Sequence, residues 1–344
     1  MLTRLGLELT TRCNLRCRHC LREVPAAPVD FPVPLLDRVL GRAREAYATK
    51  SVTLTGGEPL LHPELEGALE AIVRHDFTFS LITNGVLLPA RLQLLCRPEF
   101  KARIGHVAVS LNGADERTHD AIRGPGSYRQ AMTAVLGLKS AGIPFALKYT
   151  LGTNNLDSIE AAVIGMAHLG PDFIELSHMT PTPDNVREGL MPTPAQLKES
   201  GAVVARLAQE LKCRVAMSAG GWTEQTFFTC AALAMQEFYV DARGWLCFCC
   251  VLPGLRGASA DGRELIADLN REDLCWGHRK LVGAIAAFQR RRIERIYDRG
   301  LTQMDHFPCL ACARYFHKLD WLSSFPDAPW GLDRLEEEKD EQTD

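Results

Sequence analysis

The sequence predicts an α/β protein built around a parallel β-sheet. Six short segments with apolar or alternating residues indicate strands, and six longer segments with apolar residues every three or four positions indicate helices. Because the two kinds alternate along the chain, successive strands are expected to be parallel and joined by right-handed crossovers. The predicted strands are 4–11, 51–54, 77–83, 104–111, 143–151 and 172–178. The predicted helices are 34–47, 64–74, 88–96, 127–141, 156–169 and 193–212.

Local signals support these elements in order along the chain. Residues 4–11 alternate between polar and apolar side chains, which is typical of a strand. The next predicted strand, 51–54, runs directly into a Gly-Gly turn. Gly142 follows helix 127–141, at the position where a helix end favours a left-handed residue.

Composition narrows the class of protein. With 344 residues the chain can bury a sizeable core and form two domains. A net charge of −3 argues against nucleic acid or an acidic membrane surface as a partner. No long apolar segment precedes the first cysteine, so we expect a cytoplasmic protein without a membrane span. Twelve cysteines in such a compartment indicate metal or redox chemistry more than disulfides.

Three of these cysteines lie within eight residues. Cys13, Cys17 and Cys20 have the spacing C-x3-C-x2-C and directly follow the first predicted strand. Thiolates are soft ligands that suit iron–sulfur clusters or zinc, and three are one short of a closed tetrahedral site. The alternative is a zinc knuckle completed by His19 or a distant cysteine.

Further polar and glycine-rich segments follow later strands. They are 55–59 (TGGEP), 84–85 (NG) and 110–113 (SLNG). Sites in parallel sheets lie beyond the carboxyl ends of the strands, where all of these segments and the cysteine loop are expected to meet.

The cysteine spacing after an N-terminal strand resembles that of the radical S-adenosylmethionine (SAM) superfamily. This resemblance implies a curved, partly open (β/α)6 TIM-like barrel. It also implies a [4Fe–4S] cluster held by the three cysteines, whose free iron binds the amino and carboxylate groups of SAM. Reductive cleavage of SAM would then give a 5′-deoxyadenosyl radical that abstracts a substrate hydrogen.

The resemblance also suggests roles for residues near the cysteines. Gly56, Gly57 and Glu58 are similar to the family's glycine-rich motif, which meets the SAM amino group. Glycines permit close approach of the backbone to a ligand, and the Glu58 carboxylate can accept from an ammonium. His19 occupies the slot before the third cysteine, which in the family helps to position the adenine. The alternative for His19 is an exposed loop histidine.

Two further cofactor contacts are implied farther along the chain. Ser110 and Asn112 stand where the family has a ribose-binding strand end, although Asp is the common residue in place of Asn112. Residues 119–124 (HDAIRG) resemble a segment of the SPASM and twitch subgroups. Its Arg123 could pair with the SAM carboxylate, because a guanidinium matches a carboxylate. The alternative for Arg123 is a surface residue at a helix end.

The second half of the chain is rich in cysteine. Cys230, then Gly244-x4-Cys249, then Cys309-x2-Cys312 resemble the SPASM order, without the two later cysteines. The four thiols match the twitch type, as in 2-deoxy-scyllo-inosamine dehydrogenase, with one auxiliary [4Fe–4S] cluster. Cys247 or Cys250 could replace Cys249, the role of Cys275 is open, and a structural zinc site is the alternative.

These observations predict two domains and a tail. Residues 1–215 would form the partial barrel, 216–320 a small twitch or SPASM-like cluster domain, and 321–344 an acidic tail. Within the second domain, residues 237–249 predict a β-hairpin. Residues 277–295 predict a basic helix, either a solvated face or a docking site for an acidic electron donor of flavodoxin or ferredoxin type.

The sequence leaves several functions open. We expect a radical SAM enzyme that oxidises or decarboxylates a small molecule such as a sugar, cyclitol or nucleoside. The alternative is maturation of a ribosomally made peptide through thioether or carbon–carbon crosslinks, and a second alternative is a non-catalytic zinc-binding module. Because the cysteine loop begins at residue 13, no fused peptide-recognition domain is expected, which favours the small molecule.

The substrate-contacting residues are harder to predict. Polar residues near the ends of the later strands are candidates, although each is more often structural. They are Lys148, Tyr149, Glu175 and His178.

Overall fold

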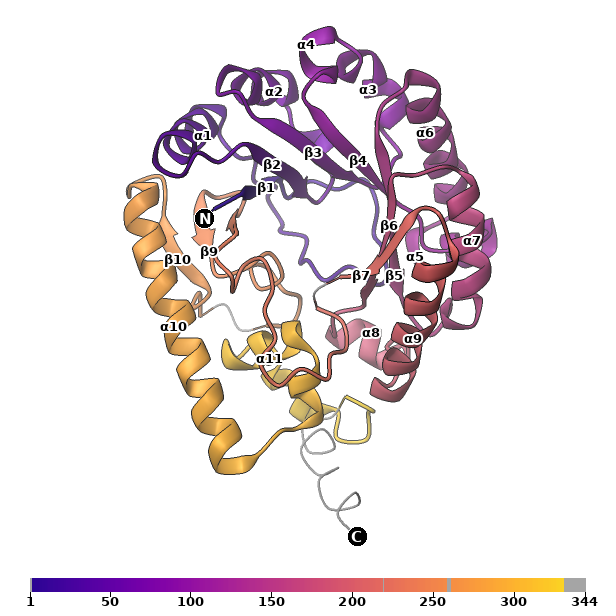
Figure 1. Ribbon diagram of the computed structural model, residues 1–344, viewed down its shortest axis with the longest axis vertical. Coiled ribbons are helices and arrows are strands. Elements are labelled where there is room, and N and C mark those ends of the chain that lie inside the picture. Colours follow the sequence, from indigo (N-terminus) through magenta and orange to yellow (C-terminus); the bar gives the residue numbers. More distant parts are fainter. Residues whose placement is uncertain (1, 219, 259–260, 331–344) are drawn as a thin grey trace.

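A computed structural model describes residues 2–218, 220–258 and 261–330, and these form an α/β protein around one ten-stranded sheet (Figure 1). The predicted α/β class is thereby confirmed. The strands are β1 (Arg4–Thr10), β2 (Ser51–Gly56), β3 (Thr78–Thr83), β4 (Ile104–Ser110), β5 (Phe145–Leu151), β6 (Phe173–His178), β7 (Arg214–Met217), β8 (Glu237–Val240), β9 (Trp245–Cys247) and β10 (Leu265–Asp268). The sheet order is β10-β9-β8-β1-β2-β3-β4-β5-β6-β7.

Strands β1 to β7 are parallel and form the curved wall of a partial barrel, with helices on the outside (Figure 1). The helices are α1 (Val33–Tyr47), α2 (Leu65–Arg74), α3 (Leu88–Leu95), α4 (Pro98–Lys101), α5 (Glu116–Arg123), α6 (Ser127–Ala141), α7 (Ile159–His168), α8 (Pro183–Arg187), α9 (Pro194–Glu210), α10 (Leu274–Arg299) and α11 (Pro308–Tyr315). The six predicted strands are all present. The prediction missed β7, whose four residues give too short a pattern to detect.

The residues at the helix ends explain where the helices begin and end. Gly142 ends α6 with a left-handed backbone, φ 61°, as its position predicted. Helix α9 begins with a capping box, in which Thr193 accepts from the Gln196 amide and Gln196 accepts from the Thr193 amide. Helix α5 was not predicted as a helix, because Ile122 is the one buried apolar residue among its eight residues and gives no periodic pattern.

The predicted hairpin is present as β8 and β9, and it joins the barrel directly. Strand β8 pairs in parallel with β1, so that Leu5 lies opposite Phe238 and Leu7 opposite Val240. The C-terminal part of the chain therefore extends the same sheet, and the two predicted domains share it. The long helix α10 runs along the outside of this extension (Figure 1).

The start of the predicted tail packs against the barrel. Trp330 is fully buried, and its indole Nε1 donates to the Pro192 carbonyl at 2.7 Å. The acidic segment 336–344 lies outside the described residues. No helix in the described ranges is long and apolar enough to cross a membrane.

Candidate active site

The cysteine loop begins at the carboxyl end of β1 and is anchored there by polar contacts. Thr10 Oγ1 donates to Asp30 Oδ1 at 2.6 Å, and the Arg12 guanidinium pairs with Asp30 at 2.9 Å. The three thiols that follow lie near one another. Burial raises the pKa of Cys13 and of Cys17, and the neighbouring thiols, Cys20 among them, add to both shifts.

The Gly-Gly segment after β2 lies directly against the start of this loop. The Gly57 amide donates to the Thr10 carbonyl at 2.8 Å, and the Glu58 amide donates to the Arg12 carbonyl at 2.7 Å. A Cβ at Gly57 would stand 2.2 Å from the Arg12 oxygen, and Gly56 has a φ of 137°. Both positions therefore require glycine to hold the cysteine loop at this place.

We expect Gly57→Ala to displace the cysteine loop, because the Arg12 carbonyl is backbone and cannot move away freely. The cost should be about 3 kcal/mol of unfolding free energy, at the upper end for overpacking. The matched control is Gly67→Ala on α2, where a Cβ would meet the Val33 side chain only at 3.8 Å. Chemical denaturation and iron content of both variants test this, and equal stability of the two would contradict it.

The sequence suggested that the Glu58 carboxylate accepts from the SAM ammonium, whereas in the structure it accepts hydrogen bonds from the protein itself. Its oxygens accept from Thr83 Oγ1 at 2.8 Å, the Asn84 amide at 2.8 Å and the Leu60 amide at 3.2 Å. The residue is fully buried, and burial raises the pKa of the carboxyl group. The carboxylate thus ties the end of β2 to the end of β3.

Asn112 and Arg123 form one buried unit. Arg123 Nε donates to Asn112 Oδ1 at 2.8 Å, and Arg123 Nη1 lies 4.0 Å from Cys17 Sγ. The Asn112 amide donates to His119 Nδ1 at 3.0 Å. Arg123 is only 9% exposed, so it is not the surface residue that its position at a helix end allowed.

Two imidazole atoms beside Arg123 have no hydrogen-bond partner among the residues that the structure describes. They are His19 Nδ1 and His119 Nε2, both buried. Burial lowers the pKa of His19, and it lowers that of His119 to about 4, with the Arg123 charge acting in the same direction. Buried polar atoms without partners are rare in native proteins and are expected where a polar ligand binds. The donor set here, three thiols beside unpaired polar atoms, fits an iron–sulfur cluster with a polar organic cofactor.

The remaining candidates lie on β4 to β6. Ser110, Lys148 and Glu175 are in register on adjacent strands, and Lys148 Nζ pairs with Glu175 at 2.9 Å. Tyr149 points to the opposite face of β5, is fully buried, and donates to the Asn155 carbonyl. We therefore withdraw it as a substrate contact.

His178 ends β6 and is half-buried. Neither of its ring nitrogens has a partner, and burial lowers its pKa to about 4. Its ring lies 5.9 Å from that of Phe307, next to the C-x2-C segment.

The C-terminal thiols form a second group. Burial raises the pKa of Cys309 well above its usual value, and the thiols of Cys249, Cys250 and Cys230 contribute. Burial also raises the pKa of Cys312, together with Cys249, Cys309 and Cys230. The structure thus brings together the four cysteines of the predicted auxiliary set and adds Cys250 as a fifth neighbour.

Two further cysteines whose roles the sequence left open, Cys247 and Cys275, lie outside this second group. Cys247 is fully buried, donates to the Trp245 carbonyl, and neighbours Asp241, Arg22 and Glu8. Cys275 begins α10 beside Tyr47. Among the described residues, no group of three or more His, Cys, Asp or Glu side chains is arranged to hold a single metal ion.

A contact that the sequence did not reveal joins the two thiol groups. Arg22 follows the last cysteine of the loop, and its Nη2 donates to the Cys250 carbonyl and to the Tyr239 hydroxyl. Its Nη1 is buried without a partner. This contact could not be predicted, because a single arginine in a loop matches no motif.

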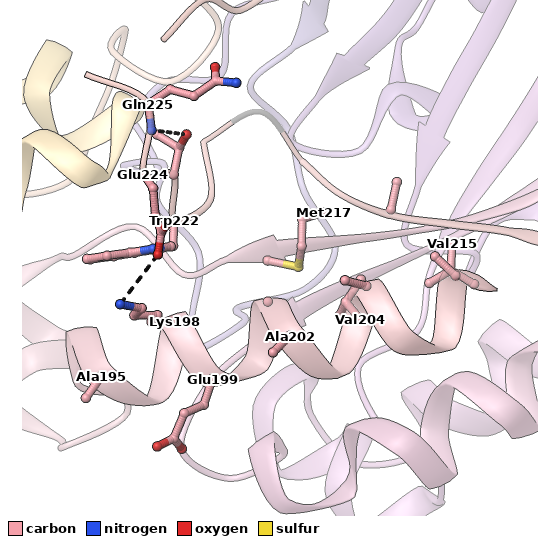
Figure 2. Close-up of a pocket in the computed structure, with 15 residues that line it drawn as sticks. Ala195, Lys198, Glu199, Ala202, Val204, Val215, Met217, Trp222, Glu224 and Gln225 are labelled. Atoms are coloured by element: carbon pink, nitrogen blue, oxygen red, sulfur yellow. Dashed lines mark hydrogen bonds and ion pairs between the residues drawn. The ribbon is translucent and has the colours of Figure 1, made fainter. Parts of the chain in front are cut away.

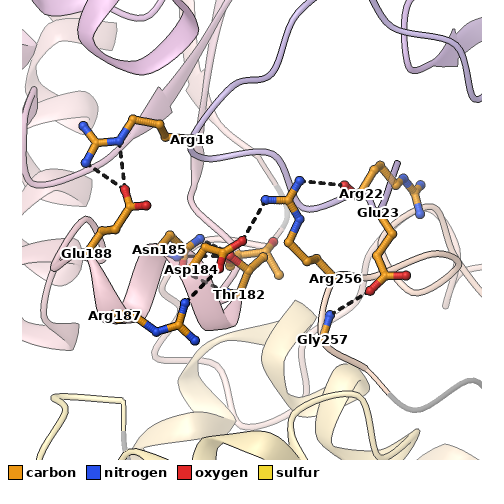
Figure 3. Close-up of polar contacts among 11 residues, drawn as sticks. Arg18, Arg22, Glu23, Thr182, Asp184, Asn185, Arg187, Glu188, Arg256 and Gly257 are labelled. Atoms are coloured by element: carbon orange, nitrogen blue, oxygen red, sulfur yellow. Dashed lines mark hydrogen bonds and ion pairs between the residues drawn. The ribbon is translucent and has the colours of Figure 1, made fainter. Parts of the chain in front are cut away.

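The outer side of the loop makes an ion pair at the end of α8 and hydrogen bonds with residues 254–257, of which Arg256 pairs in turn with α8 (Figure 3). Arg18 pairs with Glu188 at 2.7 Å, and Arg256 pairs with Asp184 at 3.1 Å. These pairs are exposed or half-exposed, so each contributes little stability.

A cavity of about 930 Å³ lies elsewhere, along the free edge of β7 (Figure 2). It is lined by α9 and by residues 222–225, where Lys198 pairs with Glu224 at 3.6 Å. None of the predicted site residues lines it. The thiols and unpaired polar atoms, and not this cavity, therefore mark the candidate site.

Comparison with known proteins gives matches in sequence and in fold. Residues 7–164 match the model of the radical SAM superfamily. The chain is 25% identical over 210 residues to a PqqA peptide cyclase of Granulibacter bethesdensis, covering 60% of this chain and 55% of the cyclase. The chain thus spans about half the length of this relative.

Solved structures share the fold. Streptococcus suis SuiB bound to S-adenosylmethionine matches with a TM-score of 0.66 at 16% identity, over 84% of this chain and 68% of SuiB. The protein anSMEcpe, bound to AdoMet and the Cp18Cys peptide, matches with a TM-score of 0.64 at 14% identity, over 95% of this chain and 97% of anSMEcpe.

Proposed function

We propose that this chain is a radical SAM enzyme that matures a peptide by forming a crosslink, on the ground that residues 7–164 match the model of the radical SAM superfamily. The observation that carries the proposal is the pair of thiol groups, joined through the bond from Arg22 to the Cys250 carbonyl. The similarity to a PqqA peptide cyclase supports a peptide as the substrate. The peptide-bound anSMEcpe structure, which shares the fold, is consistent with it. These findings favour peptide maturation over the small molecule that the start of the chain led us to expect.

In this proposal Cys13, Cys17 and Cys20 hold a [4Fe–4S] cluster, which with SAM supplies a radical that abstracts hydrogen. The segment Gly56-Gly57, packed against the cysteine loop, would bring its backbone near the SAM amino group, as the similar motif of the family does. The buried, unpaired ring nitrogen of His19 is available to the adenine. Ser110 lies next to Lys148 in register and offers a hydroxyl at the same end of the sheet.

The polar pair of Lys148 and Glu175 is the proposed peptide contact inside the barrel. Both side chains are about 30% exposed, 27% for Lys148 and 31% for Glu175, so a substrate can reach them. An ion pair at such a place can exchange its partners for charged or polar groups of the peptide. His178, at the end of β6, faces the second thiol group across Phe307.

The second thiol group has a distinct task in crosslinking. Joining two peptide atoms, X–H and Y–H, as X–Y removes two protons and two electrons. Hydrogen abstraction removes the first hydrogen atom, and an acceptor must take the remaining electron while a base takes the proton. We propose that Cys230, Cys249, Cys309 and Cys312 hold an auxiliary [4Fe–4S] cluster as this acceptor. A flavodoxin or ferredoxin-type protein would supply the electron that starts each cycle.

The experiment uses anaerobically purified and reconstituted protein with SAM and dithionite. The probe is each short peptide encoded next to the gene, analysed by mass spectrometry for the loss of two hydrogens. We expect about eight irons per chain and a crosslinked peptide. A colourless protein that binds only zinc would support the non-catalytic alternative. SAM cleavage that is stimulated by a sugar or nucleoside, and by none of the peptides, would support the small-molecule alternative.

A further inference from the structure

Arg123 carries a buried positive charge that pairs with no carboxylate among the described residues. The side chain is 9% exposed, and its two polar contacts in the described part of the chain are Asn112 Oδ1 and Cys17 Sγ. Burial raises the pKa of the Glu58 carboxyl group and the Arg123 charge acts to lower it, but the oxygens of Glu58 already accept from Thr83, Asn84 and Leu60. A buried cation of this kind needs a negative partner.

The position of the guanidinium is fixed by Asn112. Asn112 Nδ2 donates to the Thr150 carbonyl at 3.1 Å, and its backbone amide donates to His119 Nδ1 at 3.0 Å. These two bonds orient the side-chain oxygen of Asn112 toward Arg123 Nε, at 2.8 Å. Because an amide is neutral, this contact holds Arg123 without cancelling its charge. A carboxylate at the same position would cancel it.

The charge is directed at a proposed cluster ligand. Arg123 Nη1 lies 4.0 Å from Cys17 Sγ, a distance at which N–H and sulfur still interact. When a cluster held by thiolates accepts one electron from an external one-electron reductant, its charge becomes more negative by one. A positive group close to a ligand sulfur, inside the protein, stabilises the reduced state more than the oxidised state.

We propose that Arg123, held in place by the neutral Asn112, is a positioning residue that raises the reduction potential of the cluster at Cys13, Cys17 and Cys20. This inference rests on the proposed function, since it requires a cluster at that place. It assigns Arg123 an action that is already present before SAM binds, in addition to any contact with the SAM carboxylate. It also gives a reason why a neutral side chain serves at position 112.

The test is a redox titration of the full chain, reconstituted with iron and sulfide and free of SAM. Dithionite is the reductant, and the reduced clusters are followed by electron paramagnetic resonance. We expect Arg123→Gln to shift the potential of the N-terminal cluster to a more negative value, because the positive charge is removed. Asn112→Asp should shift it in the same direction while keeping the arginine, because the new carboxylate neutralises Arg123. The auxiliary cluster serves as the internal reference and should not change.

The matched control is Arg18→Gln. Arg18 is adjacent to Cys17 in sequence and carries the same charge, but its side chain is 46% exposed and paired with Glu188. Water and that partner screen it, so its removal should leave the potential unchanged.

Four outcomes decide between these possibilities. A negative shift in Arg123→Gln and in Asn112→Asp, with none in Arg18→Gln, supports the proposal. Unchanged potentials in the first two variants overturn it, as does a shift that arises only after SAM is added, since Arg123 would then act on SAM alone. A wild-type protein with no cluster at all overturns the proposed function itself, which iron content and colour reveal before any titration.

Discussion

Replacing Cys17 by alanine is expected to abolish the formation of 5′-deoxyadenosine from SAM. Cys17 lies at the centre of the loop, where Cys13 and Cys20 both influence its thiol. Without it the cluster retains two of three thiolates, and the described residues bring no other cysteine into this group. Activity should fall to the level of a control without enzyme, because a cluster with a missing ligand cannot hold and reduce SAM.

The measurement is chromatography of 5′-deoxyadenosine after anaerobic incubation with SAM and dithionite. The matched control is Cys96→Ala at the end of α3, a half-buried cysteine outside both thiol groups. This variant should cleave SAM at the wild-type rate. Cleavage by the Cys17→Ala protein at more than a trace would show that the cluster lies elsewhere.

The second large effect concerns the C-terminal thiols. A variant in which Cys13, Cys17 and Cys20 are all alanine should still bind about four irons in one cluster, since Cys230, Cys249, Cys309 and Cys312 remain. The complementary variant, Cys309→Ala, should lose that cluster and still cleave SAM. It should form little crosslinked peptide, because the second electron has no acceptor.

Folding must be checked in Cys309→Ala, because a closed four-thiolate site adds stability of its own. Thermal unfolding of the variant, followed by circular dichroism, provides this check. The control is Cys213→Ala, next to β7 and away from both thiol groups. A normal yield of crosslinked peptide from Cys309→Ala without its second cluster would make that cluster structural and the reaction redox-neutral.

The local parts of this fold could be predicted from the sequence, whereas its long-range contacts could not. Periodicity located the strands from β1 to β6, because each strand shows its own burial pattern. The pairing of β1 with β8 joins residues such as Leu7 and Val240, which no local pattern connects.

The same limit applies to the site. The thiols could be assigned to two groups by spacing, but the partners of individual polar residues depend on packing. Alternation places Lys148 and Tyr149 on opposite faces of β5, yet it does not say which face is the interior. Arg123 was predicted as a possible surface residue, and only the packing of α5 shows that it is buried.

The parallel pairing of β1 with β8 has a consequence for biogenesis. During synthesis, one edge of β1 remains without its partner until residues 237–240 have left the ribosome. Pairing of two strands that lie more than two hundred residues apart in the sequence is slow. Until it is complete, the unpaired edge of β1 favours aggregation. Cys250, whose carbonyl Arg22 holds, emerges later still. The nascent chain therefore has to be protected until its C-terminal part arrives, and insertion of iron and sulfide into the finished loop is expected to follow release from the ribosome.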